Sequence, residues 1–248
     1  MGERTIAPGL LVRGFVPPLR LADFGLAAFD MDSTLISIEC VDEIAEVAGK
    51  KAEVAAITEA AMRGEIADYK ESLRRRVALL KGVPAAALQR VYDERLRFNP
   101  GAERLVSACK AAGLKTLLVS GGFTFFTDRV RDRLGIDFTR SNVLEIEDGT
   151  LNGRKIAGGV LTGRLVDQPW GDICDGEEKR KMLLETCATL GLSPSRAIAA
   201  GDGANDLPMM AAAGLSVAYH AKPTVREAAM VAIDAGGLDR LLEVFSPA

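Results

Sequence analysis

Two aspartates separated by one residue, Asp30 and Asp32, are the side chains of this sequence best placed to do chemistry. They follow a short apolar run, Leu26–Phe29, which we expect to form a buried strand. Open α/β sheets bind ligands at the carboxyl ends of their strands, and the alternation of an extended backbone would point both acids to one side. Two carboxylates this close repel each other unless a cation or a shared proton relieves the repulsion. The pair therefore predicts a Mg²⁺ site, and Mg²⁺ in turn favours a phosphate substrate.

Two further polar loops follow predicted strands. Ser120-Gly121-Gly122 comes after the apolar residues 116–119, and the acid-rich segment 202–206 comes after residues 197–200. In a parallel sheet these ends lie on the same rim as the aspartate pair. Lys179 begins the helix that precedes the last of these strands. Carboxylates, a hydroxyl beside glycine N–H groups and a cation are together what phosphoryl transfer requires.

The elements that position these residues alternate between strands and helices. We expect strands at residues 26–29, 116–119, 197–200, 215–219 and 231–233, and helices at residues 102–112, 124–134 and 179–190, a helix ending at 213, and one at 236–245. Such alternation predicts an α/β fold, a parallel sheet with helices on both faces. Residues 143–146 and 161–166 read as a hairpin, with turn signals at Asp148-Gly149 and Gly158-Gly159.

The stretch from residue 41 to 98 is rich in helix formers and poor in strand signals. We expect helices at residues 43–48, 54–62, 69–80 and 84–96, which would form a small bundle inserted after the first strand. The predicted organisation is a core made of residues 1–37 and 98–248 and a helical cap domain made of residues 38–97. The first ~20 residues read as a partly ordered lead-in, because they hold no strong periodic pattern.

The composition narrows the classes of function. The 248 residues carry a formal net charge of −3, so they lack the basic surplus typical of nucleic-acid-binding proteins. No apolar run approaches the roughly 18–20 residues that span a bilayer, and residues 1–21 lack the apolar core of a secretory signal. The four cysteines form no Cys-x-x-Cys pair, which predicts buried, reduced thiols. We therefore expect a cytoplasmic protein with a small-molecule substrate and no nucleic-acid or membrane partner, either a monomer or a homodimer.

Several motifs in order resemble the haloacid-dehalogenase-type phosphatases. Residues 30–34 (Asp-Met-Asp-Ser-Thr) resemble the first motif of that superfamily, residues 119–123 the second, Lys179 the third and residues 201–206 the fourth. Residues 38–44, 72–77 and 203–209 are most similar to the phosphoserine phosphatase branch. The resemblance covers about residues 24–242. It implies a doubly wound, Rossmann-like parallel sheet with an inserted helical cap, and Mg²⁺-dependent hydrolysis of O-phospho-L-serine, the last step of serine biosynthesis.

The resemblance also implies roles for individual residues. Asp30 would be the nucleophile that forms an aspartyl-phosphate, and Asp32 would be the general acid and base. Mg²⁺ would be held by Asp30, the backbone carbonyl of Asp32, and Asp202, with Asp206 supporting the site from behind. The substrate would be bound by Glu39, Arg76, Ser120, Gly121, Lys179 and Asn205. Within this set, Glu39 would meet the ammonium group of phosphoserine and Arg76 its carboxylate.

Some of these residues have local rivals. Arg74, Arg75 and Arg76 diverge by about 100° each on a helix, so at most one points into a given pocket. Lys179 has neighbouring cations at positions 180 and 181. Glu39 could instead be an acid in the first turn of a helix. For these residues the choice rests on the family pattern.

Two other functions use similar residues. A related phosphotransferase, for example one that moves phosphate from phosphoserine to homoserine, would keep the same core and change the contacts of the insert. A signalling receiver also gathers acids, a hydroxyl and a lysine around Mg²⁺, but it is much shorter and needs no helical insert. The insert and the position of Asp32 favour an enzyme over a receiver.

Overall fold

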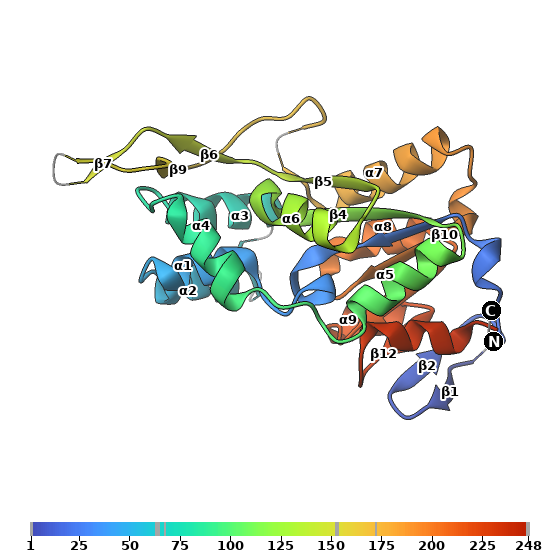
Figure 1. Cartoon of the computed structure of the whole chain (residues 1–248). Coiled ribbons are helices and arrows are strands. Elements are labelled where there is room, and N and C mark those ends of the chain that lie inside the picture. Colours follow the sequence, from blue (N-terminus) through green and yellow to red (C-terminus); the bar gives the residue numbers. More distant parts are fainter. Residues whose placement is uncertain (1, 63–64, 67, 152–153, 172, 247–248) are drawn as a thin grey trace.

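An eight-stranded sheet forms the centre of the molecule (Figure 1). The computed structural model describes all residues except 1, 63–64, 67, 152–153, 172 and 247–248. The strands of the sheet are β1 (Arg4–Ala7), β2 (Leu10–Val12), β3 (Leu26–Phe29), β4 (Lys115–Phe123), β5 (Phe138–Asn142), β10 (Ala197–Gly201), β11 (Leu215–Tyr219) and β12 (Val231–Ile233). Their order is β1-β2-β12-β11-β10-β3-β4-β5. All neighbours from β12 to β5 are parallel, which confirms the predicted sheet.

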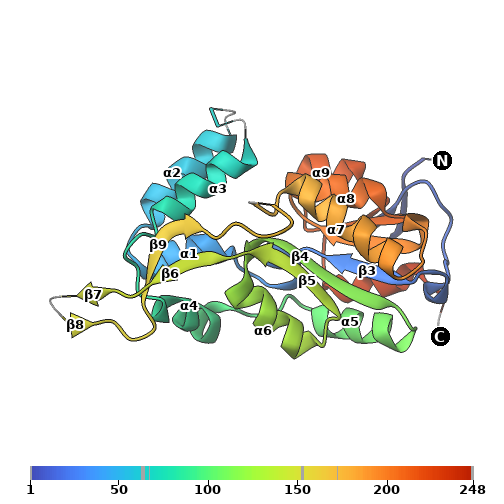
Figure 2. The ribbon, with the colours of Figure 1, turned by 90° about the horizontal axis from the view of Figure 1, so that it is seen from above.

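Helices cover both faces of this sheet (Figure 2). One face carries α5 (Ala102–Ala111), α6 (Thr124–Leu134) and the 3₁₀ segment η6 (Leu238–Val244), and the other carries α7 (Gly176–Thr189), α8 (Leu207–Ala212) and α9 (Pro223–Ala228). Alternate residues of β3 supply the two sides, because Ala27 and Phe29 belong to one buried cluster while Leu26 and Ala28 belong to the other. The fold is therefore doubly wound, as predicted.

A group of helices lies beside one end of the sheet, between β3 and α5 in the chain (Figure 1). It contains α1 (Cys40–Val47), α2 (Lys51–Met62), α3 (Tyr69–Ala78), α4 (Ala86–Arg90) and the wide turn η3 (Val91–Arg95). We call these five elements the helical insert. The helix expected at residues 84–96 is present at residues 86–95, where α4 continues without a break into the wider turn η3. The ends of the insert meet, since Ile36 pairs with Phe98 and the Ser37 N–H donates to the Arg97 carbonyl at 2.9 Å.

A β-arm projects past the helical insert (Figures 1 and 2). Strands β6 (Leu144–Glu147) and β9 (Val160–Leu165) pair antiparallel, and β7 (Thr150–Leu151) and β8 (Arg154–Lys155) extend the pair outward. The arm is bonded to the insert, because the N–H of Gly82 donates to the carbonyl of Leu161 at 2.8 Å. The hairpin was predicted correctly but its turn was not. Asp148-Gly149 only joins β6 to β7, since pairing continues beyond it, and residues 152–153, between β7 and β8, lie outside the described residues.

Two parts of the sheet differ from what the sequence predicts. Residues 4–12 are not a lead-in: β2 is fully in the core and pairs antiparallel with β12, and β1 forms the outer edge. Strand β5 was also missed, because its residues Phe-Thr-Arg-Ser-Asn lack an apolar run. It lies at the opposite edge of the sheet, where only β4 pairs with it.

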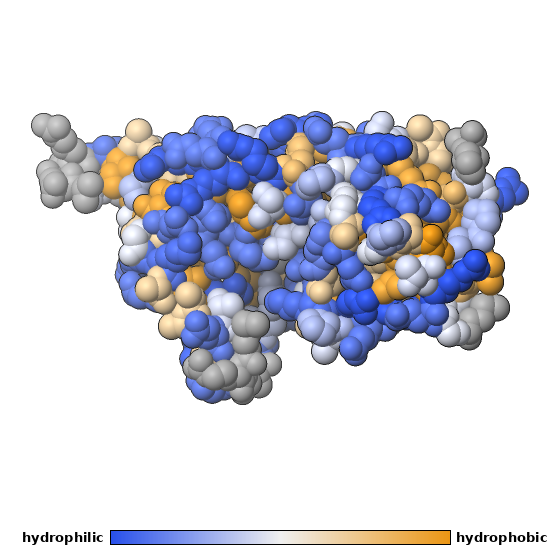
Figure 3. Space-filling model, turned by 90° about the horizontal axis from the view of Figure 1, so that it is seen from below, coloured by the Kyte–Doolittle hydropathy of each residue, from blue (hydrophilic) through white to orange (hydrophobic). Residues whose placement is uncertain are grey.

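The face seen in Figure 3 is mainly hydrophilic, with hydrophobic residues exposed in patches between the polar ones. Among the described residues, the large hydrophobic side chains that are well exposed are Val16, Ile146 and Val166. None of the helices that the structure describes has both the length and the apolar character needed to cross a membrane. All four cysteines are buried and free of disulfide bonds, as predicted.

Candidate active site

Three segments meet at one rim of the sheet, at the carboxyl ends of β3, β4 and β10. Because β3 lies between β4 and β10, the residues that follow these strands become neighbours. The Asp30 N–H donates to the carbonyl of Ala200 in β10 at 3.0 Å. Across the same rim, the Thr34 hydroxyl donates to Oδ1 of Asp202 at 3.2 Å. The structure thus brings together segments that lie far apart in the sequence.

The turn after β3 is held by a residue that the sequence analysis did not single out. Residues 31–35 form an irregular helical turn in which Ser33 has a φ of 59°, a backbone conformation unusual for residues other than glycine. The Asn99 side-chain amide donates to the carbonyls of Ser33, Thr34 and Ile36 at 3.1, 2.9 and 3.0 Å. Asn99 lies between η3, the last element of the insert, and α5 in the chain. Its position between the insert and the core is what makes it a clamp for the aspartate turn.

Lys179 lies at the base of the site, with no exposed surface. Its Nζ donates to Oδ1 of Asp30 at 2.7 Å and to Oδ1 of Asp206 at 2.6 Å. A buried ammonium group needs such partners, because an unpaired charge in the interior is strongly destabilising. The rival cations Arg180 and Lys181 line a different cavity. Of these three cations, Lys179 is therefore the one that bonds Asp30 and Asp206.

Asp206 organises the loop after β10. While its Oδ1 accepts from Lys179, its Oδ2 accepts the backbone N–H groups of Asp202 and Gly203 at 3.1 and 3.0 Å. Both oxygens are therefore engaged by the protein itself. This arrangement fixes the Asp202 backbone and leaves Asp206 as a supporting group.

The acids form a cluster that suits a divalent cation. One carboxylate oxygen from each of Asp30, Asp202 and Asp206 can be chosen so that all lie within 4.8 Å of one another. Burial, then repulsion from Asp206, raises the pKa of Asp30 well above its ordinary value and raises the pKa of Asp202 to about 7. Carboxylate oxygens are the hard donors that Mg²⁺ prefers. A bound Mg²⁺ would also relieve the repulsion between these carboxylates, so the cluster fits this ion.

Asp32 stands apart from this cluster. Its Oδ2 accepts the backbone N–H of Cys40 at 3.3 Å, whereas its Oδ1 is buried and has no hydrogen-bond partner among the described residues. Burial, followed by repulsion from Glu39, raises the pKa of Asp32 to about 8. The raised pKa favours the protonated carboxyl group, which can donate a proton.

The last residues of β4 line the same cavity as the acids: the strand continues to Phe123, beyond its predicted end at residue 119, and its pairing with β5 is irregular between Val119 and Phe123. Within this stretch the Ser120 hydroxyl accepts the N–H of Gly122 at 2.8 Å. Asn142, a residue that the sequence analysis did not single out, donates to the Gly121 carbonyl at 2.8 Å and accepts the N–H of Cys174 at 2.8 Å. Asn142 ends β5, so detecting it required detecting that strand.

A cavity of about 850 Å³ lies between the rim and the helical insert. The predicted site residues that line it are Asp30, Asp32, Glu39, Arg76, Ser120, Gly121, Asp202 and Asn205, while Lys179 and Asp206 lie beneath its floor. Four buried side-chain polar atoms lack a partner among the described residues, and three of them belong to cavity residues: Asp32 Oδ1, Asp42 Oδ1 and Arg76 Nε. Because buried polar groups are normally satisfied, these atoms indicate a polar ligand.

One acidic and one basic residue at the insert side of the cavity were predicted to bind the substrate, Glu39 and Arg76. Glu39 precedes α1 but makes no capping bond, and its Oε1 accepts the Ser33 hydroxyl at 2.7 Å. Of the three successive arginines, Arg76 lines the cavity, whereas Arg75 is exposed and bonds Glu71 at 2.7 Å. Glu39 and Arg76 are thus among the charged side chains that line the cavity beyond the acid cluster, and the others are Asp32, Asp42, Asp68, Asp175, Glu177 and Lys222.

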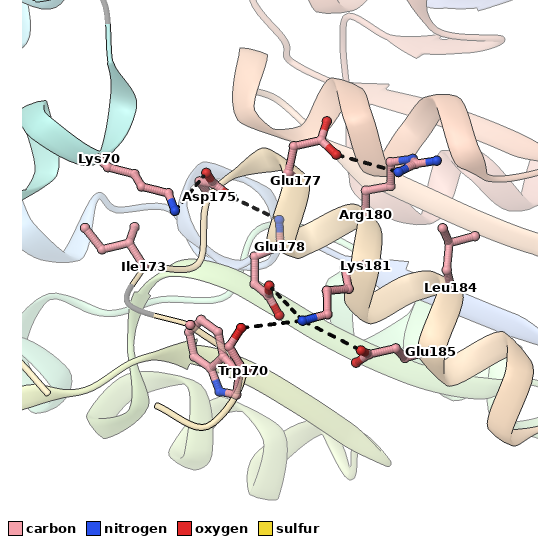
Figure 4. Close-up of a pocket in the computed structure, with 11 residues that line it drawn as sticks. Lys70, Trp170, Ile173, Asp175, Glu177, Glu178, Arg180, Lys181, Leu184 and Glu185 are labelled. Carbon is pink, nitrogen blue, oxygen red and sulfur yellow. Dashed lines mark hydrogen bonds and ion pairs between the residues drawn. The ribbon is translucent and has the colours of Figure 1, made fainter. Parts of the chain in front are cut away.

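A second, smaller cavity of about 430 Å³ lies between α3 and α7 (Figure 4). Its charged groups pair with one another: Lys70 with Asp175 at 3.5 Å, Arg180 with Glu177 at 3.6 Å, and Lys181 with Glu178 at 3.7 Å. None of the predicted site residues lines it. The larger cavity is therefore the candidate active site.

The chain is similar to known proteins over nearly its whole length. The family described as haloacid dehalogenase-like hydrolase matches residues 27–211. A phosphoserine phosphatase of Polaromonas sp. is 75% identical over 244 residues, covering 98% of this chain and 99% of that protein. One of Albidiferax ferrireducens is 71% identical over 247 residues, covering 100% of both. A solved structure described as a phospho-aspartyl intermediate analogue of phosphoserine phosphatase is 33% identical, has a TM-score of 0.78, and is covered to 99% by 90% of this chain.

Proposed function

The chain belongs to the haloacid dehalogenase-like hydrolase family, and from this we propose that it hydrolyses O-phosphoserine to serine and phosphate. The observation that carries the proposal is the composition of the large cavity. The residues at the ends of three strands supply the groups that phosphoryl transfer needs. The same cavity is also lined by the anionic side chain of Glu39 and the cationic side chain of Arg76. Phosphoserine is a phosphate ester with one ammonium and one carboxylate group, so a selective site needs these two extra charges. The relatives at 71% and 75% identity are named phosphoserine phosphatases.

Asp30 acts as the nucleophile in this proposal. One carboxylate oxygen attacks phosphorus, the bond from phosphorus to the serine oxygen breaks, and an aspartyl-phosphate forms. A carboxylate needs no base to activate it, which suits a site without a nearby histidine. Lys179 orients the side chain by donating to its Oδ1 at 2.7 Å. The solved structure that is 33% identical is named as a phospho-aspartyl intermediate analogue of phosphoserine phosphatase, which supports this step.

Asp32 acts as general acid and then as general base. In the first half-reaction it gives its proton to the leaving serine oxygen, and in the second it takes a proton from the water that attacks the aspartyl-phosphate. A pKa of about 8 keeps the acid form populated at neutral pH. The unpartnered Oδ1 is the atom available for both transfers.

The phosphate is bound by Ser120, Gly121 and the ammonium group of Lys179. Backbone N–H groups and a buried cation stabilise the charge that spreads over the phosphoryl oxygens. Mg²⁺ would be held by Asp30, Asp202 and the backbone carbonyl of Asp32, with Asp206 supporting the loop. When bound, it would neutralise negative charge between the nucleophile and the phosphate.

The helical insert acts as a cap domain, with boundaries near residues 38 and 97, that supplies selectivity. Glu39 binds the ammonium group of the substrate, Arg76 its carboxylate, and Asn205 lies near the substrate from the core side. Both charged residues reach the cavity from the insert side. Covering the site also excludes water during the first transfer.

A substrate panel tests the proposal. The purified protein with Mg²⁺ should release phosphate from O-phosphoserine far faster than from glycerol phosphate or a sugar phosphate. Absent or equal turnover would contradict the substrate assignment. Adding homoserine and searching for phosphohomoserine tests the phosphotransferase alternative, which the names of the relatives do not favour.

A further inference from the structure

One face of helix α3 lines the same cavity as Ser120 and Gly121 at the end of β4. Tyr69, Ser72, Leu73 and Arg76 of α3 all line the cavity, at the spacing of one face of a helix. Tyr69 is the first residue of the helix, one end of this face, and Arg76 lies two turns later. Tyr69 and Arg76 therefore lie at opposite ends of this helix face.

The hydroxyl of Tyr69 lies against Gly121. A Cβ atom added to Gly121 would be 2.0 Å from Oη of Tyr69 and 3.2 Å from its Cζ. No side chain could occupy that space without moving the tyrosine. Tyr69 of the insert can thus lie this close to the end of β4 only because position 121 is glycine.

This hydroxyl is chemically unused in the structure. Among the described residues it has no hydrogen-bond partner, although charged groups of Asp30, Lys179 and Arg76 influence it. Burial raises the pKa of Tyr69 above its ordinary value, so the hydroxyl remains a donor at every working pH. Because Tyr69 lines the cavity and its hydroxyl lies beside Gly121, this hydroxyl is available to donate to a ligand bound there.

The position of Tyr69 is fixed from both sides. Asp68 caps α3 by accepting the N–H of Lys70 at 3.0 Å. Lys70 reaches from α3 to Asp175 at the start of α7, the helix that carries Lys179 (Figure 4). The insert is therefore tied to the core one residue from the tyrosine.

We propose that Tyr69 is a further substrate-binding residue, whose hydroxyl donates a hydrogen bond to an oxygen of the phosphate group bound at Ser120-Gly121. The inference rests on the proposed function, because it takes the loop at Gly121 to be the phosphate site. It adds a consequence: the phosphate site is complete only when the insert is docked on the core. Helix α3 would then bind both ends of the substrate, the phosphate through Tyr69 and the carboxylate through Arg76.

The test is the Tyr69→Phe variant, which removes only the hydroxyl. With Mg²⁺ present, the affinity for inorganic phosphate, measured by calorimetry, should fall about tenfold, the value of one hydrogen bond to a charged group. The melting temperature without ligand should stay unchanged. Tyr92→Phe is the matched control, because Tyr92 also lies in the insert but does not line the cavity. Wild-type phosphate affinity in Tyr69→Phe, or an equal loss in Tyr92→Phe, would overturn the proposal.

A double-mutant cycle checks the contact itself. Gly121→Ala should weaken phosphate binding more in the wild-type background than in the Tyr69→Phe background, because the closest contact is to the hydroxyl oxygen. Strictly additive effects would overturn the inferred geometry. Phosphate binding does not depend on which ester is hydrolysed. A failure to turn over phosphoserine would therefore contradict the proposed function without deciding the role of Tyr69.

Discussion

Lys179 shows how a single residue can organise this site. Its ammonium group lies between Asp30 and Asp206, so it neutralises part of the charge of the nucleophile and anchors the loop that carries Asp202. Without it, two buried carboxylates would face each other unpaired. The same residue thus serves both the stability of the fold and the chemistry of the rim.

The residue most directly tested is Asp30. Asp30→Asn should lower phosphate release from phosphoserine by on the order of 10⁴-fold or more, because the amide is not a nucleophile and no second path is available at the site. Steady-state release of phosphate measures the effect. Asp148→Asn is the control, since Asp148 is an exposed acid of the β-arm. Substantial turnover by Asp30→Asn would contradict covalent catalysis through this side chain.

Arg76 carries the prediction about selectivity. Arg76→Ala should raise KM for phosphoserine by about 10- to 100-fold, the range expected for a lost hydrogen bond to a charged group. KM for phosphoethanolamine, which has no carboxylate, should change much less. Arg75→Ala provides the comparison, because Arg75 is exposed and pairs with Glu71. If both substrates are affected alike, Arg76 does not bind the carboxylate.

At the level of elements, the central strands could be predicted and the edges could not. Residues 26–29 and 197–200 are short apolar runs followed by acids, so their burial and polarity change are visible in the sequence. Strand β5 is polar and takes its conformation from pairing with β4. Strand β2 owes its place to β12, more than 200 residues away in the chain, which no local pattern reveals.

The candidate site divides in the same way. Residues with charged or hydroxyl side chains in short motifs could be found from the sequence, because their types and spacing carry the chemistry. Asn99, Asn142 and Tyr69 could not, since each lies against a segment distant in the sequence: Asn99 at the aspartate turn, Asn142 at the Gly121 carbonyl and Tyr69 in the space that a side chain at position 121 would fill. Tyr69 in particular reads as one more apolar position of an amphipathic helix.

The helical insert should change its exposure when the site is filled. Hydrogen exchange of the backbone amides in α3 should slow by about tenfold with Mg²⁺ and a phosphate analogue, because the ligand would join Arg76 to the core loops. Helix α5, which packs on the sheet away from the cavity, serves as the internal reference. Equal protection of both helices would indicate general stabilisation and not docking of the insert.

For the molecule as a whole, the acid cluster links stability to pH. Burial gives Asp30, Asp32 and Asp202 raised pKa values, to about 8 for Asp32 and about 7 for Asp202. The folded state then binds protons more tightly than the unfolded state, so the free energy of unfolding falls as pH rises from about 4 through these values. The metal-free protein should melt about 4 °C or more lower at pH 8.5 than at pH 6.

Added Mg²⁺ should reverse most of this loss, and its effect should be larger at pH 8.5, where the carboxylates are ionised. Thermal melts at the two pH values, with and without Mg²⁺, measure both effects. Asp202→Asn should flatten the pH dependence of the metal-free protein, whereas Asp148→Asn should not. A metal-free protein that grows more stable between pH 6 and pH 8.5 would contradict the electrostatic account of the cluster.

We propose that catalysis depends on three strand ends that act on one phosphate through Asp30. A crystal structure with Mg²⁺ and beryllium fluoride, which mimics a phosphoryl group, tests this most directly. We expect the fluoride complex on the carboxylate of Asp30, against Ser120 and Lys179, with the cation held by Asp30 and Asp202. A fluoride complex bound elsewhere, with Asp30 unmodified and no cation beside it, would contradict the central claim.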